Sequence, residues 1–543
     1  MRMSIGLLAA FICHSIAGTV EYDWNITWVD AAPDGFSRPV IGINGQWPCP
    51  TIKATVGDQV VVTIHNKLAN EATSLHFHGI LQRGTNEMDG AGQVTQCSVP
   101  PGHSFTYRFT VDKPGTYWYH SHTGGQYPDG LRGPLIVHDP DDPYHGQYDE
   151  EVVLTTSDWY HDQVPVLLNR MLSPSNVPIR LPFPDSGLLN DTSNETANVT
   201  LKFTPGKTYK IRVINMGALA AAMLQFDSHT MKVIEIDGVY VHEHHAEQIR
   251  VSPAQRYAFL LEAKPTDGRN YAFLTSFDIN KDFTKAGSDW RLNVTGYIEY
   301  DPAKTLPALF IVDDWDPLDD FTLVPYDNQK LLPVPDNQIT LDFHSGFDDL
   351  GIPRAYMNNT YVSPKVPTLY SVLTVGEDAD NPAVYGQVNP LVVQYGQTVE
   401  IVLNNLDDAI HPFHLHGHHF QVCNRPSSGA GSFSGDNRAF PSVPVRRDTV
   451  SVNANSHVVL RFTADNPGVW LFHCHIEWHV SMGLVATIIE APAKLQRAIT
   501  IPQHHLDICI AQCLPTAGNA AGNTVNHTDL AGANTASPNP DNG

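Results

Sequence analysis

The chain has 543 residues, 42% of them hydrophobic and 17% charged, and its formal net charge at pH 7 is −24. One hydrophobic core does not extend over a chain of this length, so we expect several domains. The acidic balance excludes nucleic acid and anionic membrane surfaces as expected partners, because both repel a negatively charged protein.

The first 18 residues have the pattern of a secretory signal peptide. Arg2 gives a positive start, an apolar stretch follows from Ile5 to Ile12, and small residues around Ala17 suit cleavage. Seven Asn-x-Ser/Thr sequons in the rest of the chain agree with the secretory route. No later stretch is apolar for long enough to span a membrane. We therefore expect a secreted or cell-surface protein without a membrane span in this chain.

One sequence pattern occurs three times, at residues 57–66, 206–215 and 396–405. Each copy is a glycine turn, then an alternating stretch rich in β-formers, then an asparagine, which predicts a half-buried strand leaving a turn. With 39 Gly, 40 Pro and few helical patterns, the repeat predicts an all-β chain of three consecutive β-sandwich domains. Their expected bounds are 19–145, 150–305 and 335–495.

Two segments outside these domains differ in composition. Residues 306–334 are rich in Pro and Asp and are predicted to be a linker. Residues 496–543 form a C-terminal tail, and from residue 515 onward its Asn, Ala, Gly, Thr and Pro content predicts disorder.

Ten histidines and one cysteine form four short clusters in the first and third predicted domains. They are His76 and His78; His120 and His122; His411, His414 and His416; and His473, Cys474, His475 and His479. On a strand, residues i and i+2 share a face, so each His-x-His pair directs two imidazoles to one side. Cys474 must then face a different metal from its two neighbours. Imidazole with thiolate suits copper, which implies electron-transfer or oxygen chemistry.

The clusters also repeat between the two domains. Residues 76–79 match 414–417, and residues 114–122 match 467–475. The simplest assembly docks the first domain on the third and shares one metal cluster between them. The middle domain would then be a spacer and could form a wall of the pocket. The remaining histidines suggest no site: His242 and its neighbours are predicted to lie in a solvated loop, and His418 and His419 to flank the ligands.

Cysteine usage fits an oxidising compartment. Of the seven cysteines, Cys13 leaves with the signal peptide and Cys474 belongs to the metal site. The remaining five are Cys49, Cys97, Cys423, Cys509 and Cys513. Because this number is odd, at least one stays unpaired or bonds outside the chain. We expect one disulfide from Cys97 to either Cys509 or Cys513.

The four clusters, in this order and across three sandwich domains, resemble the multicopper oxidases, the family of laccases, ascorbate oxidases and ferroxidases. Residues 157–162, 364–369, 465–470 and 473–479 most resemble its fungal iron-uptake ferroxidase branch. The resemblance implies cupredoxin-like Greek-key domains and four copper ions: one type 1, one type 2 and a type 3 pair. It also implies that a reducing substrate is oxidised one electron at a time at the type 1 copper, while the three-copper cluster reduces O2 to water.

The resemblance assigns a role to each cluster residue. His411, Cys474 and His479 resemble the type 1 ligands, and Leu484, ten residues after the cysteine, falls on the axial position. Leucine does not ligate, so the copper should be three-coordinate and strongly oxidising. The type 2 ligands would be His76 and His414. The type 3 ligands would be His78, His120, His122, His416, His473 and His475. Asp89 and Glu477 resemble the acids that deliver protons to the cluster.

The substrate is set by the rim of the type 1 site. Ferroxidases of the iron-uptake branch place carboxylates there, and Asp407 and Asp278 are candidates in this chain. The branch's glutamate falls on Leu181, and a later aspartate falls on Phe283, beside Asp282. Leucine in place of glutamate removes a charge and makes an apolar wall, to which residues 219–224 would add.

The altered rim favours a laccase-like oxidase of phenols and polyphenols, with Asp407 accepting the phenol proton, in pigment or secondary-metabolite formation. The alternative is a ferroxidase that converts Fe2+ to Fe3+ in iron uptake, with an iron permease as partner. A copper-storage or electron-carrier protein is a third reading, which the full set of ten histidines disfavours.

Overall fold

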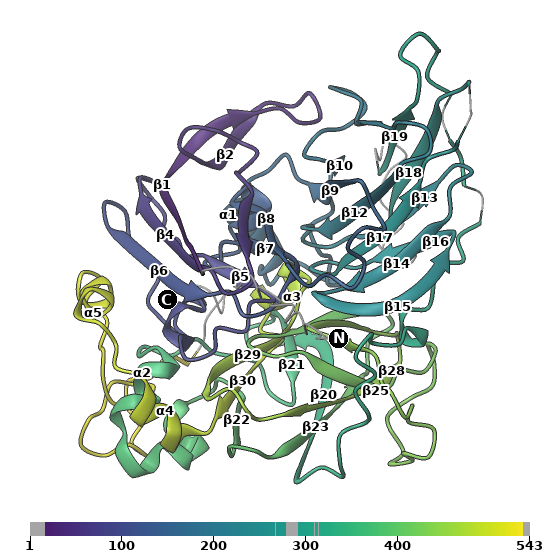
Figure 1. Ribbon diagram of the computed structural model, residues 1–543. Helices are drawn as coiled ribbons and strands as arrows, with labels where there is room; N and C mark the ends of the chain where they lie inside the picture. The colour runs from purple at the N-terminus through teal and green to yellow at the C-terminus, as the bar shows by residue number, and fades with distance from the viewer. Residues whose placement is uncertain (1–16, 266–267, 279–291, 309, 313, 536–543) are drawn as a thin grey trace, which may run out of the picture.

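The computed structural model describes residues 17–265, 268–278, 292–308, 310–312 and 314–535, so nearly all of the predicted signal peptide lies outside it. These residues form six β-sheets, two in each third of the chain, and Figure 1 shows the three pairs as three lobes. The expected all-β class with three sandwiches is confirmed. The exact domain bounds stay a prediction.

The first lobe packs two four-stranded sheets. The strand order of one sheet is β2 (Arg38–Ile43), β1 (Thr19–Ala31), β4 (Gln59–Asn66), β6 (Ser104–Thr110). The strand order of the other is β3 (Ile52–Thr55), β8 (Arg132–His138), β7 (Gly115–His120), β5 (His76–His78). Inward and outward positions alternate along β6, as expected for a strand with one face on a core.

The second lobe has sheets of six and five strands. Their orders are β10 (Ser186–Leu189), β9 (Glu150–Trp159), β12 (Thr208–Asn215), β17 (Arg256–Glu262), β14 (Met231–Ile236), β15 (Val239–Ala246), and β11 (Thr200–Lys202), β19 (Asn293–Glu299), β18 (Tyr271–Asp278), β13 (Ala221–Phe226), β16 (Gln248–Val251). The predicted loop around His242 is instead part of β15. It was misread because β15 is an edge strand whose outward positions are polar.

The third lobe repeats this plan. Its sheets run β21 (Pro353–Met357), β20 (Asn337–Phe347), β23 (Thr398–Asn405), β28 (Ser456–Thr463), β25 (Phe420–Asn424), β26 (Arg446–Arg447), and β22 (Pro390–Val393), β30 (Val485–Glu490), β29 (Gly468–Cys474), β24 (His411–Leu415), β27 (Thr449–Val452).

The threefold sequence repeat corresponds to one topological position. Strands β4, β12 and β23 each pair in parallel with the first long strand of their own lobe, namely β1, β9 and β20. On the other side each pairs antiparallel with a later strand of the same sheet. The three lobes are therefore copies of one sandwich, as the repeat predicts.

The helices are short and lie outside the sheets. They are α1 (Val164–Met171), α2 (Thr368–Thr374), α3 (Glu477–Ser481), α4 (Pro492–Ala498) and α5 (Gln503–Ile510), with 3-10 turns η1 (Asn86–Met88), η2 (Tyr127–Asp129), η4 (Asp320–Thr322), η5 (Gly376–Asp380) and η6 (Pro382–Tyr385). None of the helices among the described residues has the length and apolar character needed to cross a membrane.

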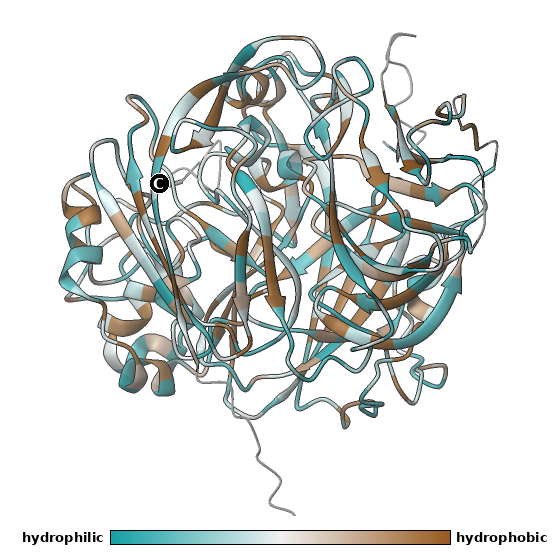
Figure 2. Cartoon of the chain, turned by 45° about the horizontal axis from the view of Figure 1, so that its top comes forward, coloured by the Kyte–Doolittle hydropathy of each residue, from teal (hydrophilic) through white to brown (hydrophobic). Residues whose placement is uncertain are grey.

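The apolar cores run across the seams between lobes. One cluster of buried side chains joins the second and third lobes and includes Trp118 of the first, while another joins the first lobe to Leu471 and Val485 of the third. In Figure 2 much of the hydrophobic colour lies on strands in the middle of the molecule. Because apolar cores extend across the seams, the lobes are held as one body.

The C-terminal segment corrects one expectation. Residues 515–535, predicted to be disordered, pack against the third lobe: Asn519 and Ala520 are buried, and Ala520 N–H donates to the Val384 carbonyl. Composition misses this because single asparagines cap the turns; the Asn519 amide donates to the carbonyls of His527 and Asp529. The expected disulfide joins Cys97 to Cys509 on α5.

Candidate metal centre

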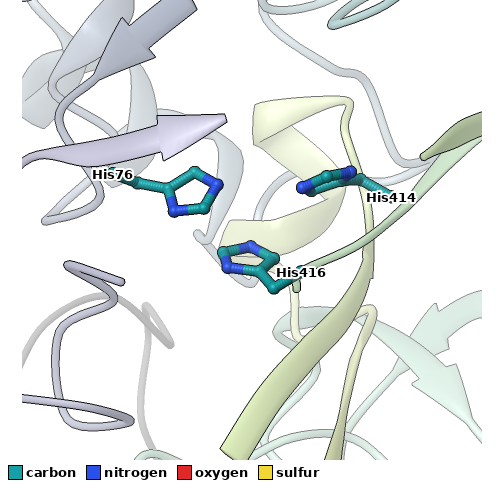
Figure 3. A group of neighbouring side chains, drawn as sticks. All are labelled: His76, His414 and His416. Carbon is teal, nitrogen blue, oxygen red and sulfur yellow. The ribbon is translucent and has the colours of Figure 1, made fainter. Parts of the chain in front are cut away.

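Four strand ends from two lobes bring eight histidines together. His76 on β5 lies opposite His120 on β7, and His414 on β24 lies opposite His473 on β29. Across the seam between lobes, the His76 ring stacks on His416 with centroids 4.0 Å apart. Figure 3 shows these two rings together with His414. All eight predicted cluster histidines are at most 4% exposed. The predicted docking of the first domain on the third is confirmed.

The ring nitrogens converge in groups of three. Within each group, one nitrogen per histidine lies within 4.8 Å of the others. The groups are His76, His414 and His416; His76, His78 and His120; and His122, His416 and His473. The His475 ring joins them, with its centroid 5.0 Å from that of His78 and 5.4 Å from that of His120.

Hydrogen bonds fix which nitrogen of each ring faces the centre. Nδ1 of His76, His120 and His414 lies 2.8–2.9 Å from a backbone carbonyl. A carbonyl only accepts, so Nδ1 donates and Nε2 keeps a bare lone pair. Those three Nε2 atoms are buried without a hydrogen-bond partner, as are both nitrogens of His475. Leaving a buried polar atom unpaired costs about 1–3 kcal/mol.

The contact between His416 and His473 indicates a site for a cation. Nε2 of His416 and Nε2 of His473 lie 3.1 Å apart, and the Nδ1 atoms of both rings donate to oxygens. Two lone pairs therefore face each other at hydrogen-bond distance, which is repulsive. Burial and the neighbouring imidazoles hold the pKa of both rings well below the ordinary value, so neither is protonated. Copper fits this set of neutral, converging nitrogens.

A separate group, made of His411, Cys474 and His479, is the predicted type 1 site. His411 Nδ1 and His479 Nδ1 lie 3.7 and 3.5 Å from Cys474 Sγ, and the three residues are buried. Cys474 thus points away from its flanking histidines, as its place on a strand predicts. Burial raises the pKa of the Cys474 thiol well above its usual value, so a bound metal is needed to hold it as thiolate.

Leu484 lies beside this site. Its N–H donates to the His479 carbonyl, and its own carbonyl accepts from Cys474 N–H. The side chain is buried and offers no ligand atom. The structure is therefore consistent with its predicted axial place.

The three predicted acids occupy different positions. Asp89 Oδ2 accepts from His416 Nδ1 at 2.8 Å, and its Oδ1 lies 3.3 Å from His76 Nδ1. Although burial raises the pKa of Asp89, these imidazoles outweigh it and leave the pKa well below the ordinary value. Glu477 is buried at the start of α3; a Cβ added at Gly125, three residues after His122, would lie 3.0 Å from its Oε1.

Asp407 lies on the outer side of the type 1 site. Its Oδ2 is 3.5 Å from His411 Nε2, and its side chain is 18% exposed. The Ser345 N–H and hydroxyl each donate to its carboxylate at 3.0 Å. Asp407 therefore lies between the surface and His411, a predicted type 1 ligand.

The sequence reasoning missed Asp448. Its buried carboxylate lies 3.4 Å from His78 Nε2 and 3.5 Å from His414 Nδ1, so it contacts predicted ligands of both lobes. Burial raises the pKa of Asp448, but the Arg256 guanidinium holds it well below the usual range. The sequence around Asp448 has no spacing typical of metal ligands. The only feature that marks this position is a charged run, 446–448, between two apolar stretches.

Comparison with known proteins identifies related chains. Three models described as multicopper oxidase match residues 25–142, 150–303 and 361–494. The chain is 52% identical over 536 residues to the iron transport multicopper oxidase fetC of Epichloe festucae, covering 97% of this chain and 85% of the relative. It is 41% identical over 543 residues to the iron transport multicopper oxidase FET3 of Saccharomyces cerevisiae, covering 97% and 84%.

Two solved structures have the same architecture. The crystal structure of Fet3p, a multicopper oxidase that functions in iron import, superposes with a TM-score of 0.91 at 41% identity and covers 94% of this chain and 98% of that chain. The laccase from Botrytis aclada superposes with a TM-score of 0.76 at 28% identity, covering 92% of each chain.

Proposed function

The chain belongs to the multicopper oxidases, and we propose that within this family it oxidises Fe2+ to Fe3+ with O2 as the electron acceptor. This reverses the order of preference drawn from the sequence, which placed phenols first. Support comes from the relatives: chains named for iron transport are 52% and 41% identical, against 28% for the laccase.

Asp407 is the observation that carries the proposal. A partly exposed carboxylate stands 3.5 Å from the outer nitrogen of His411, held by two hydrogen bonds from Ser345. Carboxylate oxygen suits a hard divalent cation. An Fe2+ ion bound there would lie one side chain away from a type 1 ligand, which is a short path for an electron.

We infer that Asp278 supplies a second carboxylate on this side. The Glu477 N–H donates to the Ala218 carbonyl, which holds the segment leading into β13 against the start of α3. Ala221 of β13 pairs with Asp278, the last residue of β18. The Asp278 side chain is 37% exposed and lies 3.5 Å from Arg250 Nε. Phe283, on which the branch's later aspartate falls, and its neighbour Asp282 lie outside the described residues.

The position of Leu181 weakens the hypothesis of phenol oxidation, which was based on this residue. Its side chain is 5% exposed and packs in the apolar core. It therefore offers little surface for a neutral aromatic ring to contact. The expected apolar wall is not presented at the surface by this residue.

Copper, when bound, supplies one-electron oxidation at the Cys474 site and the reduction of O2 to water at the three-copper site. The balanced reaction is four Fe2+, one O2 and four protons giving four Fe3+ and two waters. His411, Cys474 and His479 would hold the first copper. The eight cluster histidines would hold the other three.

We further propose that Asp89 and Glu477 take part in delivering protons to the three-copper site. Asp89 accepts from His416 and orients that ring, while Glu477 is buried beside the loop that follows His122. Both carboxylates are inside the protein, where a positioned acid transfers protons more effectively than bulk water.

The experiment compares Fe2+ with a diphenol as reductant under matched copper loading. We expect a higher kcat/KM for Fe2+, and Asp407→Asn should lower it at least about tenfold, which is about 1.4 kcal/mol of transition-state stabilisation. Asp408→Asn is the matched control, because Asp408 is an exposed neighbour. A higher kcat/KM for the diphenol would overturn the proposal and restore phenol oxidation as the function.

Location and partner follow from the same proposal. The sequons and the Cys97–Cys509 disulfide support an enzyme outside the cell or on its surface. An iron permease would be the partner that receives Fe3+. Co-purification of the two proteins from a membrane fraction would test that pairing.

A further inference from the structure

A single arginine of the second lobe reaches both other lobes. Arg256, the first residue of β17, is fully buried. Its Nη1 and Nη2 donate to the two oxygens of Asp448 in the third lobe at 2.7 and 2.6 Å. Its Nε donates to the carbonyl of Thr116 in the first lobe at 2.8 Å. The guanidinium thus joins three segments that are far apart in the sequence.

Asp448 carries this contact to the copper ligands. Its carboxylate lies 3.4 Å from His78 Nε2 and 3.5 Å from His414 Nδ1, and its carbonyl accepts from His414 Nδ1 at 2.9 Å. His78 comes from the first lobe and His414 from the third, and their rings stack with centroids 3.7 Å apart. The Arg256–Asp448 pair therefore supports a stacked histidine pair that spans the seam between the first and third lobes.

The backbone beside the ligands leaves room for the pair. Gly79 follows His78 with φ +89°, and a Cβ at this position would lie 2.6 Å from Arg256 Nη2 and 2.8 Å from Asp448 Oδ2. Only a glycine allows the ligand strand to end this close to the ion pair. The glycine of the His-x-His-Gly pattern is thus explained by a residue of another lobe.

We propose that Arg256 is a positioning residue for the three-copper site: it fixes the Asp448 carboxylate, which orients His78 and His414. The second lobe, which holds none of the ten ligand histidines, thereby sets the geometry of the copper cluster. The proposal holds whether the reductant is Fe2+ or a phenol, because it concerns the cluster and not the rim.

A structural role in joining lobes must be separated from this one. Arg212 on β12 is the matched control, since it is 2% exposed and lies at the same seam. Its Nη1 donates to Thr116 Oγ1 at 2.7 Å and to Glu235 at 2.9 Å. None of the contacts described for it reaches Asp448. A residue that merely joins lobes should behave like Arg212.

The test measures copper directly. Copper-loaded Arg256→Gln, Arg256→Lys and Arg212→Gln are titrated with a copper chelator, followed by the type 2 electron paramagnetic resonance signal and by the blue absorption of the Cys474 site. In Arg256→Gln we expect type 2 copper to be held about 10- to 100-fold more weakly, with the blue absorption retained. Arg256→Lys should restore part of this, because lysine keeps the charge but not the bidentate geometry.

Two results would overturn the proposal. One is a type 2 signal and chelator resistance in Arg256→Gln equal to the parent. The other is an equal loss of type 2 copper in Arg212→Gln, which would reduce Arg256 to a seam contact. If Arg256→Gln does not fold, Arg256→Lys decides by the same readout: an altered type 2 signal supports the proposal, and a parental one refutes it.

Discussion

Replacing Gly79 with alanine should damage both the fold and the contact between Arg256 and Asp448 beside the copper cluster. The added Cβ would lie 2.6 Å from Arg256 Nη2, 2.6 Å from Tyr117 Cδ1 and 2.8 Å from Asp448 Oδ2. The guanidinium has little freedom to retreat, because hydrogen bonds to Thr116, Ala254 and Asp448 hold it.

The magnitude follows from two contributions. The left-handed backbone, with φ +89°, disfavours an L-residue by about 1–2 kcal/mol. Breaking one charge-assisted hydrogen bond of the buried pair adds about 1.5–3 kcal/mol. We therefore expect Gly79→Ala to destabilise the folded chain by about 3–5 kcal/mol.

Gly84→Ala isolates the backbone contribution. Gly84 also has a positive φ, +72°, but nothing lies within 4 Å of its added Cβ. Calorimetry of both copper-loaded variants beside the parent gives the comparison. Gly79→Ala should melt about 1–3 °C below Gly84→Ala. Equal melting temperatures would show that the Arg256–Asp448 pair yields without cost, and the steric reasoning would be wrong.

Other expected outcomes concern the type 1 site and one buried acid. Cys474→Ser should remove the blue colour and turnover with every reductant; full activity in the variant would refute the assigned electron entry. Leu484→Met should lower the type 1 potential by adding a weak ligand, and an unchanged redox titration would refute the axial assignment. Burial raises the pKa of Asp129 to about 6 despite its ion pair with Arg38, so this group should make stability fall as pH rises from about 4 to 6. Asp129→Asn should flatten that part of the stability profile measured by denaturant unfolding, and an unaltered slope would contradict the assignment.

The sequence alone predicts those features that follow from a regular spacing of residues. His-x-His pairs on strands fix which side chains share a face, so the ligand clusters and the opposite direction of Cys474 follow from spacing alone. The threefold Gly-strand-Asn repeat likewise predicts three copies of one sandwich, which β4, β12 and β23 form.

The ion pairs between lobes were beyond such reasoning. Asp448 and Arg256 meet 192 positions apart, and neither has a spacing that marks a site. Leu181 was read as an exposed rim residue because sequence does not give burial. The order seen in residues 515–535 depends on Asn519 capping turns that composition does not encode.

The split origin of the copper ligands has a consequence for biogenesis. His76, His78, His120 and His122 emerge early during synthesis, whereas the partner histidines from His411 to His475 emerge in the last quarter of the chain. The complete set of eight histidines therefore comes together only after the third lobe has folded and docked on the first. Copper bound between histidines of both lobes would then stabilise the docked arrangement, because such ions need ligands from both lobes.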